Sequence, residues 1–194
     1  AVELIQHNID IFNTLTLTGE NVTIRQGNAK DLSFIEDEAY DITLLLGPMY
    51  HLFTVEDQLQ ALNEAIRVTK KGGILFVAYC GNDATMVQYC FGRGMLKEDK
   101  YRKLVDPVTF KAASDPAELF ELYRKEDIDE LISHFNVQRL HYIGTDMATN
   151  YMRPVIDEMD DEFFALYLKY HFTICERADM VGTSHHILDV LRKE

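Results

Sequence analysis

The sequence YDITLLLGP, residues 40–48, decides the fold class of this protein. Residues 42–46 are apolar except for Thr43, and Gly47-Pro48 ends the run, which is typical of a parallel strand covered on both faces. A helical pattern over 55–69 follows, stops at KKGG (70–73), and leads into a second apolar run, ILFVAY, at 74–79. Strand, helix and strand in this order predict right-handed crossovers in a doubly wound α/β sheet that is mostly parallel.

A shorter unit is predicted before residue 40. AVEL at 1–4 has the pattern of the end of a buried strand, and Ile5, Ile9 and Phe12 fall on one face of the helix that follows. Residues 22–26 alternate in polarity like a short strand that ends at Gly27.

Residues 82–134 have a different pattern, with helical stretches interrupted at Asp106-Pro107 and Asp115-Pro116 and no convincing strand between them. We interpret this segment as a helical cap inserted into a core domain made of residues 1–81 and 135–194. DPAE at 115–118 predicts a helix start with Asp as N-cap and Pro at the first helical position. Further on we expect a helix over about 152–176 and strands at 137–143 and 185–191, which form a terminal antiparallel hairpin.

The composition excludes several classes of protein. With 47% hydrophobic and 26% charged residues, the 194-residue chain can bury a full-sized core. Its net charge of −13 disfavours nucleic acid as a partner. No apolar run is long enough for a membrane helix and the N-terminus lacks a signal-peptide pattern, so we expect no membrane partner and a cytoplasmic location. Three cysteines without metal-like spacing predict buried thiols and no metal site.

Ligands of an open α/β sheet bind at the carboxyl ends of the strands, so the residues there are the candidate site. Glu3 ends the first strand, where nucleotide-binding sheets place a carboxylate for two ribose hydroxyls, although it could equally be a surface acid. Asn28 follows Gly27 and can pair with an adenine edge or simply form a turn. Gly47 allows a ligand to approach the backbone closely.

These stretches together resemble the Rossmann-like family of methyltransferases that depend on S-adenosylmethionine (SAM). The resemblance rests on residues 1–4, 26–32, 40–52 and 61–73, with GPMYHL at 47–52 similar to a subgroup's glycine-proline-leucine-tyrosine-histidine-leucine motif. It covers residues 1 to about 80 well, and SHHIL at 184–188 is similar to the start of the family's last strand.

The resemblance implies a role for each matching residue. Glu3 would bind the SAM ribose, Leu4 would pack on the adenine face, and Asn28 would pair with the adenine amino group. The backbone N–H of Ala29 would bind an adenine ring nitrogen, and Leu46 and Gly47 would lie beside the sulfonium and methionine portion. Asn28 stands where aspartate is commoner in the family.

One element of the family pattern is absent, because no glycine-rich G-x-G-x-G motif occurs in this sequence ahead of Glu3. We therefore expect that upstream polypeptide supplies the motif and its strand, that another chain supplies the strand, or that the protein is a degenerate relative. Without that strand, its two neighbours would have unpaired edges and exposed apolar faces, which favours self-association into a homo-oligomer.

The acceptor of the methyl group is predicted to be a small molecule. Tyr50 and His51 are weak candidates for catalysis, and with Tyr89, Tyr151 and Tyr170 they could line an aromatic pocket or belong to the core. Three other functions remain open: a non-catalytic SAM or nucleotide-binding protein on the same fold, a dinucleotide oxidoreductase, and a structural interaction domain.

Overall fold

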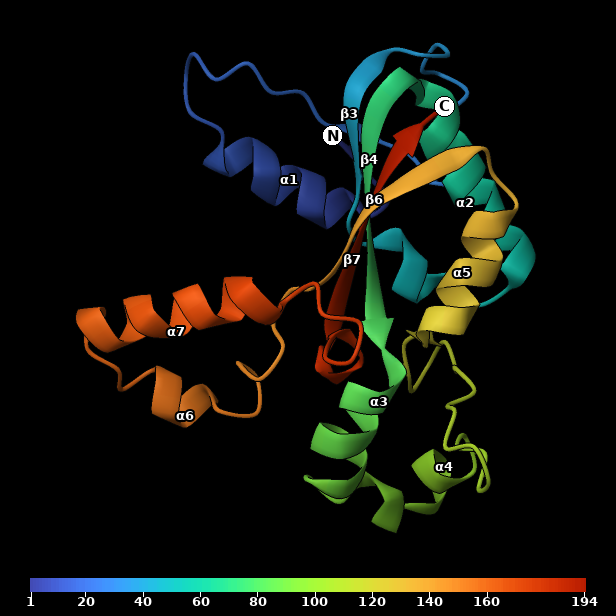
Figure 1. Cartoon of the computed structure of the whole chain (residues 1–194). Helices are drawn as coiled ribbons and strands as arrows, with labels where there is room; N and C mark the ends of the chain where they lie inside the picture. The colour runs from blue at the N-terminus through green and yellow to red at the C-terminus, as the bar shows by residue number, and fades with distance from the viewer.

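The computed structural model describes residues 1–194, and its strands form two separate sheets, of which Figure 1 shows the larger. The larger sheet contains four strands in the order β3 (Tyr40–Leu45), β4 (Thr69–Gly81), β7 (His186–Lys193) and β6 (Val137–Gly144). A fifth strand, β5 (Leu122–Tyr123), pairs with the end of β4. The smaller sheet is the parallel pair β1 (Val2–Glu3) and β2 (Arg25–Gln26).

Helices and short helical turns join these strands. The α-helices are α1 (Gln6–Leu15), α2 (Val55–Val68), α3 (Asn82–Thr85), α4 (Asp99–Arg102), α5 (Lys125–Ser133), α6 (Arg153–Ile156) and α7 (Asp161–Ile174). The short turns are η1 (Pro48–His51), the π-helical η2 (Met86–Phe91), η3 (Met95–Lys97) and η4 (Val181–Thr183).

The predicted α/β class is confirmed. β3 and β4 are parallel, as are β4 and β5, whereas β7 runs antiparallel to both β4 and β6. The two late strands therefore pair as expected, and they form one side of the larger sheet.

The main core lies between the larger sheet and the helices α2 and α5, which cover the same side of it in Figure 1. Helix α2 begins where the Thr54 side chain accepts a hydrogen bond from the Asp57 N–H at 3.2 Å, and Leu62 and Ala65 of its apolar stripe are fully buried. Leu75 and Val77 of β4 meet this stripe.

The prediction that the run at 42–46 is covered on both faces is wrong. Leu45 is buried, but Ile42 and Leu44 on the opposite face are 59% and 61% exposed. The physical reason is that only one face of β3, the face of Leu45, is packed against the core, and the opposite face is left uncovered. β3 is also the last strand of its sheet and pairs only with β4. β1 likewise pairs only with β2, so the expected unpaired edges and exposed apolar residues are both present.

The segments outside the sheet differ from the sequence-based expectation in three places. Helix α5 does not belong to a separate cap, because Ile128 and Leu131 are part of the main core. Residues 115–118 form a turn closed by a bridge from Asp115 to Leu119 instead of a helix. The helix expected over 152–176 is divided into α6 and α7, and Asp160 caps the start of the second.

Cys80, Cys90 and Cys175 are buried free thiols, as predicted. None of the helices combines the length and the apolar character that crossing a membrane requires.

Candidate functional site

The carboxyl ends of β1 and β2 lie next to each other. The strands pair in parallel, with Glu3 opposite Gln26, and the Gly27 N–H donates to the Glu3 carbonyl at 3.0 Å. This register brings Glu3 and the turn that begins at Asn28 to one edge of the small sheet.

Two contacts with α2 fix the loop that follows β2. Lys30 Nζ lies 2.8 Å from Asp57 Oδ1, and the Arg67 guanidinium donates to the carbonyls of Leu32 and Ile35 at 2.9 and 2.8 Å. Ala29 packs against the main core. The small sheet is thereby attached to the helix that covers the large one.

The Glu3 carboxylate has one oxygen committed within the protein. Its Oε1 accepts a hydrogen bond from the Ile5 N–H at 2.8 Å and so stabilises the first turn of α1. The other oxygen, Oε2, makes no hydrogen bond to the protein and can accept one from a ligand. Leu4, next in the chain, is 61% exposed and available as an apolar contact.

Asn28 forms a turn, which was the simpler of the two roles predicted for it. Its Oδ1 accepts from the Lys30 N–H at 3.0 Å, and the turn closes where the Asp31 N–H donates to the Asn28 carbonyl at 2.9 Å. The turn leaves the amide nitrogen of Asn28 and the backbone N–H of Ala29 without hydrogen bonds inside the protein. Both are donors at the end of β2.

Gly47, at the end of β3, faces open space. Its φ of −134° suits any residue, and a Cβ placed there would meet nothing nearer than the Tyr50 hydroxyl at 3.9 Å. Gly27 is different, because a Cβ there would lie 2.9 Å from Val2 Cγ1. Packing therefore requires a glycine at 27, whereas at 47 neither packing nor backbone conformation does, and the free space is available to a ligand.

Tyr50 and His51 lie in η1 directly after Gly47 and support this turn. The Tyr50 hydroxyl donates to the Leu46 carbonyl at 3.1 Å, and its pKa is raised by burial and by the neighbouring Cys80. Both rings pack with Phe120, at centroid distances of 5.6 Å for Tyr50 and 5.0 Å for His51. A protonated, hydrogen-bonded Tyr50 is suited to holding the end of β3 in place.

A cluster around Asp146 escaped the sequence analysis. Asp146 Oδ2 lies 2.8 Å from His186 Nδ1, while Oδ1 accepts from the Ser184 hydroxyl and from the His185 N–H. Burial raises the pKa of Asp146, but the hydrogen bonds from His186 and Ser184 outweigh it and leave the pKa lowered. The same bond raises the pKa of His186. Asp146 follows β6, and His186 begins β7 directly after His185, so no local pattern joins them.

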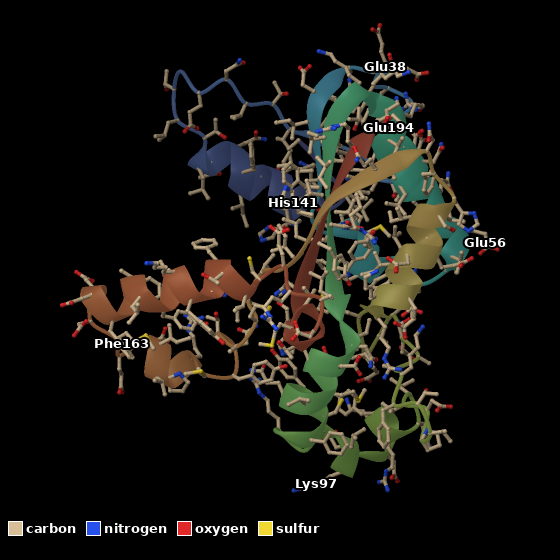
Figure 2. All side chains as sticks on the ribbon, viewed as in Figure 1. Glu38, Glu56, Lys97, His141, Phe163 and Glu194 are labelled. Carbon is tan, nitrogen blue, oxygen red and sulfur yellow. The ribbon has the colours of Figure 1, made fainter.

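The aromatic residues that were expected to line one pocket separate into groups. Tyr89 and Tyr151 lie together around His185, with ring centroids 5.1 and 5.9 Å from the imidazole. Tyr170 is 55% exposed on α7. Figure 2 shows α7 standing away from the sheet, with Phe163 on it far from the strand ends.

Two open hollows on the surface do not include the predicted site. One, of about 370 Å³, is bordered by Thr149, α6 and the start of α7, and the other, of about 310 Å³, lies between α5 and β6. Neither is lined by Glu3, Asn28 or Gly47. Their linings combine few apolar groups with exposed charges, which is poor for holding a small molecule.

Part of the chain is similar to a known protein family. Residues 1–77 match the family model described as a methyltransferase domain, and these residues include the ends of β1, β2 and β3. No curated protein matches the sequence.

Known structures share the fold over nearly the whole chain. A SAM-dependent methyltransferase from Methanosarcina mazei has a TM-score of 0.59 at 12% identity, covering 99% of this chain and 80% of its own. A Thermotoga maritima protein, described as a SAM-dependent methyltransferase and possible histamine N-methyltransferase, has a TM-score of 0.56 at 16% identity, covering 100% and 72%. The cyclase SpnF has a TM-score of 0.54 at 14% identity, covering 99% and 65%. At these identities the likeness concerns the fold.

Proposed function

We propose that this protein transfers the methyl group of SAM to a small-molecule acceptor. The observation that carries the proposal is the free space in front of Gly47, because nothing in the protein requires a glycine there. The match of residues 1–77 to a methyltransferase domain and the fold shared with SAM-dependent methyltransferases support it.

The residues at the strand ends fit the adenosine half of SAM. Glu3 Oε2 is free to accept from the ribose hydroxyls, and the exposed Leu4 side chain is available to the adenine face. The Ala29 N–H can donate to an adenine ring nitrogen. Asn28 Oδ1 already accepts from Lys30 but keeps a second lone pair for the adenine amino group.

The end of β3 suits the reactive half. SAM supplies a methyl group made electrophilic by the adjacent sulfonium. Leu46 and Gly47 provide a close backbone approach there, and the Tyr50 hydroxyl holds the Leu46 carbonyl in place. Positioning of this kind is the main contribution that a protein makes to an in-line displacement.

The core domain in this proposal consists of residues 1–81, 135–194 and, from its packing, α5. The substrate side is formed by what remains of the 82–134 segment together with residues 145–152. A net charge of −13 favours a small acceptor over nucleic acid.

Titration with SAM and NAD tests the cofactor. We expect saturable SAM binding, competition by S-adenosylhomocysteine and no comparable NAD binding. Glu3→Ala should weaken SAM affinity by about 1.5–3 kcal/mol, the loss expected for charge-assisted hydrogen bonds. Glu3→Gln is the matched control for folding, since its side-chain oxygen can still accept from the Ile5 N–H. Unchanged SAM affinity in Glu3→Ala at an unchanged melting temperature would remove Glu3 from the site.

A non-catalytic SAM-binding protein is the second candidate, favoured because the Tyr50 hydroxyl, the group nearest to a Cβ at Gly47, is already engaged by the Leu46 carbonyl. Isotope-labelled SAM separates the two, because an enzyme passes the label to an added amine, phenol or carboxylate. SAM binding with no labelled product from any of these acceptors would support the second candidate and contradict the first.

A further inference from the structure

Two polar atoms without partners are buried at the junction between η2 and the loop 145–152. One is Nε2 of His185, a residue only 6% exposed, and the other is Oε1 of Gln88. The Gln88 amide nitrogen donates to the Asn150 carbonyl at 3.1 Å, which places its side chain against this loop. Buried polar atoms are almost always hydrogen-bonded in folded proteins, so two unpaired ones at one junction indicate a ligand that pairs with them.

The surroundings of His185 are aromatic. Its ring lies edge-on to Tyr89, with 5.1 Å between the centroids and an interplanar angle of 80°, and at 5.9 Å from Tyr151. The Arg93 guanidinium lies over the Tyr89 ring, 4.4 Å from its centroid. Flat rings around one hydrogen-bonding nitrogen suit a flat ligand with one polar group.

The segment that carries Gln88 and Tyr89 is itself unusual. Residues Met86–Phe91 form a π-helical turn, a conformation that is rare and often found at functional sites. Asp146 holds the opposite side of the junction, because it accepts from the His185 N–H and from the Asn150 side chain at 2.7 Å. The imidazole of His185 is therefore held at its backbone while its Nε2 stays free.

This junction lies at the same edge of the sheet as Gly47. Cys80 of β4 pairs with His186, and Leu45 of β3 pairs with Val77, so β4 separates β3 from β7. β3 and β7 are therefore two strand spacings apart, about 10 Å, which is a distance that a small molecule can span.

We propose that His185, Gln88, Tyr89 and Tyr151 form the acceptor subsite, which binds a small planar molecule whose hydroxyl donates a hydrogen bond to His185 Nε2. The assignment as an acceptor subsite rests on the proposed function. In the transfer, a bond forms from the acceptor oxygen to the methyl carbon and the bond from that carbon to sulfur breaks, leaving its electron pair on sulfur. The acceptor's proton passes to His185 Nε2.

His185 has the protonation state that this role needs. Burial lowers its pKa, the charge of Asp146 opposes this effect, and His186 and Arg93 add to it, so the ring is neutral and able to accept at neutral pH. The other titratable groups facing it are the hydroxyls of Tyr89 and Tyr151; burial and the charge of Asp146 raise the pKa of Tyr151.

Phenol is the probe ligand. Toluene, which has a methyl group in place of the hydroxyl, is the control ligand. With the full chain and no SAM present, phenol should shift the His185 ring ¹⁵N resonances and raise the melting temperature, and toluene should do neither. His185→Phe removes the unpaired nitrogen but keeps a ring between Tyr89 and Tyr151, so it should fold, with an equal or higher melting temperature. Its affinity for phenol should fall at least about tenfold.

His134 is a half-exposed histidine at the end of α5. The variant His134→Phe is the control and should bind phenol like the wild type. Equal responses to phenol and toluene, wild-type phenol affinity in His185→Phe, or unmoved His185 resonances would each overturn the subsite. Because the measurement needs no SAM, its failure is distinct from failure of the SAM titration.

Discussion

The part of the chain before β3 and the part from Leu45 onward differ in how far they bury their apolar side chains. From Leu45 onward, 14 buried residues form one continuous core, with Leu62, Val77 and Leu191 at or near full burial. Before residue 40 only Ile9 and Leu32 are buried hydrophobic residues, while Leu4, Leu15 and Leu17 are each more than 60% exposed. The stability of the protein therefore resides in β4, β7, β6, α2 and α5.

This difference separates stability from function. The predicted SAM residues Glu3, Asn28 and Gly47 lie on the weakly packed side or at its border, where their substitution removes few core contacts. Variants there should change binding, and variants in the core should change folding.

The largest effect is expected at Arg139, which pairs with the fully buried Asp189 through two hydrogen bonds of 2.7 and 2.8 Å. Arg139→Met should destabilise the protein by about 3–5 kcal/mol, because it leaves a buried charge without its partner. Urea denaturation measures the change. Arg153→Met on α6, which breaks an exposed pair, should cost less than about 1 kcal/mol. Equal losses would contradict the comparison.

The stability lost in Arg139→Met should depend on pH. Burial raises the pKa of Asp189 even with Arg139 present, and removal of the arginine should raise it further. An acid with a raised pKa in the folded state stabilises that state at low pH and loses the contribution as pH rises through that pKa. The penalty of Arg139→Met should therefore be smallest near pH 4 and largest at neutral pH. A penalty that does not change with pH would show that Asp189 is not the cause.

Two leucines test the difference in packing directly. Leu62→Ala on α2 should cost about 2–5 kcal/mol, since it opens a cavity in the core. Leu15→Ala on α1, where the side chain is 71% exposed, should change stability by less than about 0.5 kcal/mol. The comparison fails if Leu15→Ala costs as much as Leu62→Ala.

Helix caps provide a smaller test. Thr54 caps α2 and Asp160 caps α7, each accepting a hydrogen bond from a first-turn N–H. Thr54→Ala should lower global stability by about 1 kcal/mol. Asp160→Ala should mainly speed amide exchange within α7, whose Phe172 is 73% exposed, and leave the urea midpoint nearly unchanged. Equal midpoint shifts would place α7 in the cooperative core.

The smallest effect concerns Asp146 and His186. The raised pKa of His186 stabilises the fold below its ordinary value of 6.5, and this contribution declines as pH rises through the raised value. The lowered pKa of Asp146 stabilises the fold above 3.8 and is lost as pH falls through the lowered value. Melting temperatures should show that His186→Ala flattens the decline above pH 6.5. If the melting temperature of His186→Ala declines above pH 6.5 as steeply as that of the wild type, groups other than His186 cause the decline.

The sequence predicted the elements whose patterns are local. The helix at 55–69 and the run at 74–79 carry their own periodicity, and both formed as α2 and β4. The KKGG stretch that was expected to separate them instead belongs to β4, which begins at Thr69. The exposed face of residues 42–46 was not predictable, because the burial of a strand face depends on which elements pack against it. The DPAE start at 115–118 was overridden by the bridge from Asp115 to Leu119.

The candidate site stays a prediction that rests on the same kind of local pattern. Glycine and polar residues after apolar runs indicated Glu3, Asn28 and Gly47, although the hydrogen bonds that engage Glu3 Oε1 and Asn28 Oδ1 leave no trace in the sequence. Asp146 and His185 are nearly 40 residues apart and meet only because β6 and β7 pair, so sequence order did not indicate their cluster.

The proposed SAM site lies at the ends of β1, β2 and β3. Amide chemical-shift mapping with SAM tests it most directly, together with Gly47→Val and with Gly182→Val as its match, since Gly182 also has open space around it and no left-handed backbone. We expect shifts at Glu3, Ala29 and Gly47 that saturate with SAM, persist in Gly182→Val and vanish in Gly47→Val. Shifts confined to other surfaces, or wild-type SAM binding by a folded Gly47→Val variant, would contradict it.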